Sequence, residues 1–129
     1  MTTPTPARTV IRRAALAGAG GAVGSAARLG IGMLIIDAPV AVLAANLTGA
    51  LLLGVLTARI PASDLRILLG TGMLGGFTTY SAFALDSVEL WALSPALAGG
   101  YIAASVIGGL LAAWLGLRIG GSSGRRRAS

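Results

Sequence analysis

The distribution of charge along this chain constrains its fold more than any other feature. Residues 38–58, 67–85 and 92–117 contain no charged side chain, and residues 14–36 contain only Arg28. A helix needs about 20 apolar residues to cross the hydrocarbon of a bilayer, and each of the four segments is about that long. The sequence therefore predicts an all-α integral membrane protein with four transmembrane helices.

The composition supports this fold class. Of the 129 residues 55% are hydrophobic and 11% are charged, whereas about a quarter of the residues in soluble domains are charged. We expect one four-helix transmembrane domain, residues 10–119, which leaves no room for a soluble catalytic domain, so an enzyme is not expected. It lies between a disordered N-terminal tail, residues 1–9, and a disordered basic C-terminal tail, residues 120–129.

Turn-forming residues predict three short connections, at residues 37–39, 61–64 and 86–95. Arginines cluster before the first span, in the second connection and after the last span, three regions that share one side of a four-span protein. The positive-inside rule assigns that side to the cytoplasm, so both termini are expected inside. Membrane topology thus accounts for the ten basic residues without nucleic-acid binding. The absence of cysteine and histidine removes nearly all zinc or copper sites.

Glycine is abundant in the chain as a whole, with 20 residues, and pairs spaced by four favour close helix packing.

The third span contains the least regular sequence. Gly75 and Gly76 are followed by Thr78 and Thr79, all poor helix formers, which predicts a helix break in mid-membrane at residues 75–79. Transport proteins use such breaks to bind ions with freed backbone groups. A plain kink is the other interpretation.

Neutral polar residues lie in the spans. The connection at residues 86–95 holds Asp86 and Glu89, so no carboxylate is expected inside a span for a proton exchanger or an acidic cation pore. Neutral donors together with a single arginine suit an anion, although each polar residue alone is also compatible with helix-to-helix hydrogen bonding. These residues are Asn46, Thr78, Thr79, Ser81, Tyr101 and Ser105.

Three motifs resemble the bacterial Fluc-type fluoride channels. Residues 75–83 read GGFTTYSAF, similar to the family's GGLTTFSTF, and NLTG at residues 46–49 and GGxxGxxxR at residues 20–28 agree in order and spacing. The resemblance covers roughly residues 17–117. It implies a fluoride-specific channel that passively exports fluoride across the bacterial cytoplasmic membrane. It also implies an antiparallel homodimer with two pores and one structural sodium ion that is not transported.

The resemblance also implies roles for individual residues. Asn46 matches the pore asparagine, and Tyr80 and Phe83 match two stacked phenylalanines. Three departures are Tyr80 for phenylalanine, Ala82 for threonine and Gly109 for serine, and the last two remove donors from the path. The implied fluoride path consists of Arg28, Asn46, Thr79, Tyr80, Ser81, Phe83, Tyr101 and Ser105, and the backbone carbonyls of Gly75 and Thr78 would hold the sodium ion.

Two other functional classes share part of the pattern. A small multidrug-type transporter would share the length, the four spans and the antiparallel dimer, but it would resemble a family that needs a glutamate in its first span, and residues 14–36 have no acid. A structural membrane subunit would share the glycine packing without needing the polar residues. The assembly also has an alternative, because nine arginines on one predicted side argue against insertion in both orientations. The partner is then either a second copy or an oppositely oriented homologue.

Overall fold

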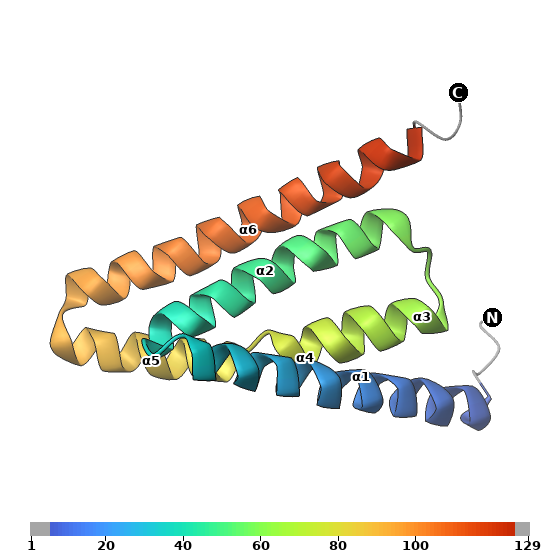
Figure 1. Cartoon of the computed structure of the whole chain (residues 1–129), viewed down its shortest axis with the longest axis horizontal. Coiled ribbons are helices and arrows are strands. Elements are labelled where there is room, and N and C mark those ends of the chain that lie inside the picture. The colour runs from blue at the N-terminus through green and yellow to red at the C-terminus, as the bar shows by residue number, and fades with distance from the viewer. Residues whose placement is uncertain (1–5, 126–129) are drawn as a thin grey trace.

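The computed structural model describes residues 6–125, and all the regular elements in that part of the chain are helical (Figure 1). Three helices are long and apolar enough to cross a membrane, and shorter segments in series make up the remaining crossing. The elements are α1 (Ala7–Leu34), α2 (Ala38–Arg59), α3 (Asp64–Arg66), the π-helix η1 (Ile67–Leu74), α4 (Gly75–Phe77), α5 (Tyr80–Leu93) and α6 (Pro95–Arg125). The predicted four-span helical fold is confirmed.

Polar residues at the helix starts determine where the helices begin. Asp37 caps α2, with its Oδ1 accepting from the N–H of Val40 at 3.1 Å, and Ser63 caps α3 through the N–H of Arg66 at 3.3 Å. Capping side chains satisfy amides that have no partner in the first turn of a helix. Both caps lie in the connections that the sequence predicts at residues 37–39 and 61–64.

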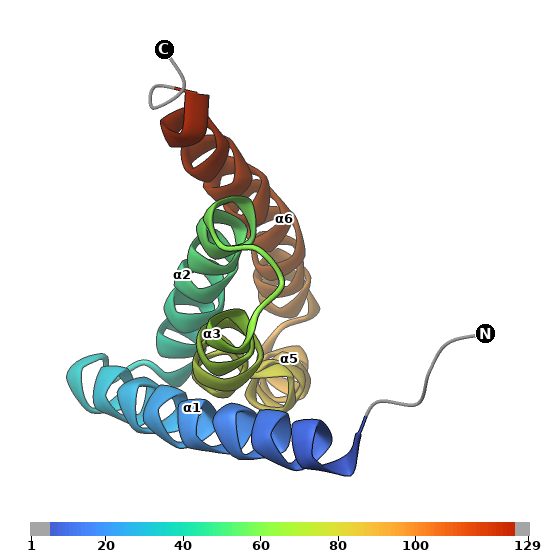
Figure 2. The same ribbon diagram turned by 90° about the vertical axis from the view of Figure 1, so that its right-hand side faces the viewer.

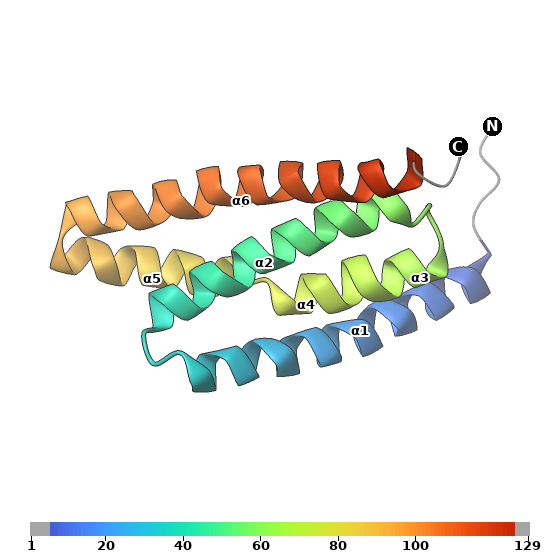
Figure 3. The same cartoon turned by 45° about the horizontal axis from the view of Figure 1, so that its top comes forward.

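The third crossing is broken at Thr78 and Thr79, as the sequence predicts. The segments before and after the break, Asp64–Phe77 and Tyr80–Leu93, are about equal in length and run on in roughly one direction (Figures 1 and 3). At about 1.5 Å per residue each half is roughly 20 Å long, which places the break near the middle of a bilayer about 30 Å thick. Gly75 and Gly76 themselves are helical, and the chain leaves the helix only after them.

The glycines bring two pairs of helices into backbone contact. The third crossing packs on α1, and α2 packs on α6 (Figure 2). A Cβ added to Gly24 would overlap the carbonyl oxygen of Met73, and one added to Gly116 would overlap that of Leu51. Such contacts supply the close packing that helices need in lipid, where no hydrophobic force drives their association.

The ends of the helices agree with the predicted topology. The start of α1, the end of α2, the start of α3 and the end of α6 all lie at one end of the molecule (Figures 1 and 3). The described arginines before the first span, in the second connection and after the last span are therefore gathered at that end. The chain is a multi-pass membrane protein, in agreement with the predicted membrane location.

The helices are longer than the sequence predicts. The predicted third connection at residues 86–95 is wrong: the connection is the single residue Ser94, because α5 continues to Leu93 and α6 begins at Pro95. Helix also covers part of both predicted tails, since α1 begins at Ala7 and α6 extends to Arg125. A helix supported by its neighbours tolerates the polar residues and glycines on which these predictions relied. Residues 1–5 and 126–129 of the predicted tails lie outside the described part of the chain.

Candidate ion pathway

The side chain of Asn46, on α2, holds the helix break. Its Nδ2 donates to the carbonyl oxygen of Thr79 at 3.0 Å, and its Oδ1 accepts from the N–H of the same residue at 2.8 Å. A backbone break at membrane depth is tolerated only when its polar groups find partners. Asn46 supplies both partners for Thr79. The two roles that the sequence allows for Asn46, bonding between helices and lining a pore, are therefore compatible with each other.

The bonds at the break leave two carbonyl groups without their helical donors. In a continuous helix the N–H of Thr79 would pair with the carbonyl of Gly75, and the N–H of Ala82 with that of Thr78. The first amide is instead donated to Asn46, and the second to the Oγ1 of Thr79 at 3.2 Å. The carbonyls of Gly75 and Thr78 therefore lack the donors that a continuous helix would give them.

These groups share one cavity. It has a volume of about 360 Å³ and opens between α2 and the third crossing. Asn46 lines it together with Gly75, Thr78, Thr79 and Tyr80, and apolar residues from both helices complete the wall. The structure thus brings five of the sequence-predicted site residues to one place at mid-membrane depth.

Aromatic rings connect this cavity to α6. Tyr80 and Phe83 lie with their ring centroids 5.9 Å apart and their planes at 52°, and Phe83 lies 5.6 Å from Tyr101. Tilted rings of this kind direct some of their electropositive edges outward. Tyr80 is 81% exposed in the single chain, whereas Tyr101 is buried.

A buried carboxylate follows this series of rings, although the sequence predicts it in a connection between helices. Asp86 lies in α5, about 9 Å beyond Tyr80 along the helix axis, and is 6% exposed. The hydroxyl of Tyr101 donates to its Oδ2 at 3.1 Å. The expectation that no carboxylate lies inside a span is therefore wrong. The spacing of three that joins Tyr80, Phe83 and Asp86 was the available signal, because it places all three on one helix face.

The two serines of the predicted path differ in their surroundings. Ser81 is exposed, and its Oγ lies 3.3 Å from the Oγ1 of Thr79. The Oγ of Ser105, on α6 one turn after Tyr101, is buried and has no hydrogen-bond partner among the described residues. A buried hydroxyl without a partner is unusual in a folded protein and indicates a missing ligand or neighbour.

Arg28 lies on the other side of the third crossing from this cavity. Its Nε donates to the carbonyl oxygen of Gly76 at 3.3 Å, and the hydroxyl of Ser25 donates to the same oxygen at 3.3 Å. Arg28 also lines a separate cavity of about 350 Å³ between the end of α1 and the start of α2. The structure therefore does not place Arg28 with Asn46. No pattern in the sequence pointed to Ser25.

Comparison with known proteins identifies the family. The family described as CrcB-like protein, Camphor Resistance (CrcB), matches residues 15–117. A protein of Paracoccus denitrificans named fluoride-specific ion channel FluC is 45% identical over 109 residues, 78% of this chain and 88% of the relative. FluC 2 of Rhodococcus jostii is 43% identical over 104 residues, 78% and 91% of the two chains.

A third relative agrees with these two. The fluoride-specific ion channel FluC of Rhizobium etli is 43% identical over 118 residues, 83% of this chain and 94% of the relative. All three relatives are named as channels, in agreement with the expectation that the chain is not an enzyme. The family match spans most of the chain and all four crossings, and therefore this chain belongs to the CrcB family of membrane proteins, the family of the FluC channels.

Proposed function

We propose that the protein is a fluoride-specific ion channel that passively exports fluoride and so lowers its concentration and toxicity in the cell. The observation that carries the proposal is the broken third crossing, where Asn46, Thr79 and Tyr80 share one cavity at mid-membrane depth. The names of the relatives, fluoride-specific ion channels, support the choice of ion.

The chemistry of the path suits a small, strongly hydrated anion. Such an ion enters a narrow path only if close donors replace its water, and it leaves only if no single site binds it tightly. Asn46 retains a second amide hydrogen beside the one it gives to Thr79, and Ser105 retains its hydroxyl hydrogen. The ring edges of Tyr80 and Phe83 add electropositive surface between these donors.

Exposed polar groups near mid-membrane argue for a second subunit. Tyr80 and Ser81 are exposed in the single chain, and so is the backbone of Gly75 beside the break. Irregular backbone does not face lipid, because its unpaired groups would each cost several kcal/mol. A homodimer covers this surface. An antiparallel arrangement makes the two breaks cross at the same depth, since each lies halfway along its span.

The orientation of the partner remains a choice between two arrangements. The arginine-rich helix ends lie at one end of the chain, which favours a single direction of insertion. An antiparallel homodimer requires both directions, whereas an oppositely oriented homologue would not. We propose the homodimer, and cysteine cross-linking between purified copies of this chain alone would distinguish the two.

A sodium ion fits the carbonyls at the break. The carbonyl oxygens of Gly75 and Thr78 have lost their helical donors, and hard cations prefer oxygen ligands. In a dimer these two residues would present four carbonyl oxygens to one ion near the two-fold axis. The ion would neutralise carbonyl dipoles that face each other there, and it would have no exit path. It is therefore proposed as structural.

Fluoride efflux from loaded liposomes tests the function. The purified protein should release fluoride when a potassium ionophore sets the membrane potential, and chloride release should be far slower. Replacing sodium on both sides by a large organic cation should slow or abolish the flux. Unchanged flux without sodium would contradict the structural ion while leaving the channel itself supported, whereas no fluoride release under any condition would contradict the channel.

The same assay separates the alternative classes. A small multidrug-type transporter would exchange protons, so its transport would respond to a pH gradient in the absence of a potential, and buried Asp86 makes this control necessary. A structural subunit would release nothing. Only a passive channel gives efflux that follows the electrical potential alone.

A further inference from the structure

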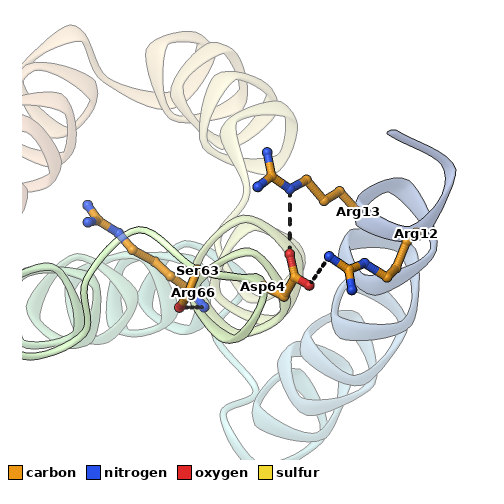
Figure 4. Close-up of polar contacts among 5 residues, drawn as sticks. All are labelled: Arg12, Arg13, Ser63, Asp64 and Arg66. Atoms are coloured by element: carbon orange, nitrogen blue, oxygen red, sulfur yellow. Dashed lines mark hydrogen bonds and ion pairs between the residues drawn. The ribbon is translucent and has the colours of Figure 1, made fainter. Parts of the chain in front are cut away.

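A strongly basic cluster lies at the end of the molecule where α1 begins and α6 ends, far from the helix break (Figures 1 and 3). It is formed by Arg12 and Arg13 on α1 and by Asp64 and Arg66 on α3 (Figure 4). The cluster contains three guanidiniums and one carboxylate, so two positive charges are in excess, and only Arg12 and Arg13 contact that carboxylate. Neither the proposed ion path nor the helix packing uses these side chains.

The two arginines of α1 share the one carboxylate unequally. The Nη2 of Arg12 lies 2.7 Å from Asp64 Oδ2, whereas Arg13 approaches Oδ1 only through its Nε, at 3.5 Å. The terminal nitrogens of Arg13 point away from the carboxylate (Figure 4). Both pairs are substantially exposed and so contribute little to stability. Arg13 therefore keeps both terminal NH2 groups of its guanidinium for another partner.

Arg66 has no acidic partner among the described residues. Its side chain extends from the side of α3 opposite Asp64 (Figure 4). The Oγ of Ser63 accepts from the N–H of Arg66 at 3.3 Å, which leaves the hydroxyl hydrogen of Ser63 free to be donated. Arg66 and Ser63 thus add a second guanidinium and a hydroxyl that are not paired with an acidic group among the described residues.

These groups line one cavity of about 240 Å³ between α1 and the start of the third crossing. Arg13, Ser63, Arg66 and Thr71 supply donors on its wall, and Ala62 and Ile67 supply apolar surface. The wall contains no carboxylate. Arginines from two helices on the wall of one cavity can together bind a phosphate group.

The depth of the cavity identifies the source of the phosphate. Arg66 lies roughly 17 Å from the break along the helix axis, which is the depth of the headgroups if the break is at mid-bilayer. The positive-inside rule places this end of one copy in the cytoplasmic leaflet, where anionic lipids are attracted to basic residues, and in the proposed antiparallel dimer the cavity of the other copy lies at the same depth in the opposite leaflet. The apolar side of the cavity can lie against the first carbons of an acyl chain.

We propose that this cavity binds the phosphodiester headgroup of an anionic phospholipid, with Arg13 and Arg66 on the phosphate and Ser63 and Thr71 as neutral donors. A bound headgroup would link α1 to the start of the third crossing. The proposal does not depend on which ion the protein conducts.

Lipid selectivity of the purified full-length protein tests this site. The probe is phosphatidylglycerol against phosphatidylcholine of identical chains, with the lipid retained after delipidation measured by native mass spectrometry and by the shift in thermal unfolding. Wild type should retain phosphatidylglycerol preferentially. Arg66→Gln and Arg13→Gln should each weaken that retention about fivefold, the expected contribution of one arginine near an anionic surface. Arg66→Lys keeps the charge and should retain most of the binding.

Arg8→Gln is the matched control, because it removes one positive charge from α1 outside this cavity. It should leave retention nearly unchanged, whereas an equal loss in Arg8→Gln and Arg66→Gln would reveal only general surface charge and overturn the site. Soluble glycerol phosphate separates the two sources of phosphate. Stabilisation by glycerol phosphate equal to that by the lipid would mean a free-phosphate site. A variant that lost fluoride flux but kept lipid retention would make the cavity an ion vestibule, and would also overturn the proposal.

Discussion

The third crossing contains fewer glycines than α6, four against eight, and nevertheless it is the third crossing that is broken. The third crossing is interrupted at Thr78 and Thr79, whereas α6 runs without a break from Pro95 to Arg125 through several glycines, including the pair at Gly108 and Gly109. Intrinsic propensity alone therefore does not decide where a membrane helix breaks. Within the third crossing, too, the paired glycines Gly75 and Gly76 remain helical.

The difference lies in what else is available to the backbone. At the break, Asn46 pairs with both polar backbone groups of Thr79, and the hydroxyl of Thr79 caps α5 through Ala82. The described part of α6 has no such side chain opposite Gly108 and Gly109: Gly108 faces Leu47, and nothing lies within 4 Å of a Cβ added to Gly109. A helix in lipid breaks where a neighbouring helix provides substitute hydrogen bonds.

Asn46→Asp should have the largest effect on this comparison. The carboxylate can still accept from the N–H of Thr79, but its other oxygen would face the Thr79 carbonyl and replace a donor by a repelling acceptor. We expect fluoride flux to be abolished and unfolding stability to fall by about 1–3 kcal/mol. Efflux and thermal unfolding in detergent measure the two effects. Thr48→Val, on an exposed position of α2, is the control. An Asn46→Asp protein that conducts at the wild-type rate would show that the path does not pass this residue.

Phe83→Ile tests the aromatic contact between the broken third crossing and the continuous helix α6. Phe83 lies between Tyr80 and Tyr101, so removing its ring interrupts the aromatic series while keeping an apolar side chain. Flux should be lost with the dimer intact by size-exclusion chromatography. Tyr80→Phe keeps the ring and should be tolerated. Normal conduction by Phe83→Ile would mean that this ring only packs.

Two substitutions within α6 test whether its glycines serve packing. A Cβ at position 116 would overlap the carbonyl of Leu51 in α2, so Gly116→Ala should destabilise the protein by about 1–3 kcal/mol. A Cβ at position 109 meets nothing within 4 Å, so Gly109→Ala should be neutral or should stabilise the helix by up to about 1 kcal/mol. Chemical unfolding in mixed micelles measures both. If the two substitutions destabilise equally, then position 109 is covered by a partner chain.

Ser105→Ala should have the smallest effect on stability and still change flux. The buried Oγ has no partner in the described structure, so its removal should alter unfolding stability by less than about 0.5 kcal/mol. If this hydroxyl donates to a passing anion, its loss should reduce flux by about tenfold, the value of one hydrogen bond. Parallel unfolding and efflux measurements separate the two. Loss of stability in proportion to flux would instead indicate a structural hydroxyl.

The sequence predicts those parts of the fold that depend on local pattern. Three charge-free segments and a fourth that contains only Arg28 predict the four crossings, and the glycines and threonines of the third span predict its break within a few residues. The third connection was misplaced because Asp86 and Glu89 were interpreted as turn residues. Asp86 is tolerated inside a helix because Tyr101, fifteen residues later, donates to it, and a single-span pattern does not contain that information.

The site is predicted unevenly for the same reason. The resemblance to the fluoride channels selects Asn46, Thr79 and Tyr80, and the structure places them around one cavity. The bidentate bond of Asn46 to Thr79 depends on how α2 crosses the third span, which the sequence pattern does not specify. The resemblance also selects Arg28, which donates to Gly76 and lines a second cavity.

The backbone contact between α1 and the third crossing has a consequence for how this protein can vary. Gly20 and Gly24 meet Gly72 and Met73 through main-chain atoms, so bringing these helices together immobilises few side-chain rotamers. The attraction is short-range dispersion, which weakens steeply once the backbones separate. A larger side chain at either glycine must push the helices apart, because rotamer changes cannot relieve a clash with main-chain atoms. We therefore expect Gly20 and Gly24 to tolerate no larger side chain, whereas exposed positions elsewhere can accept substitutions one at a time with small effects on stability.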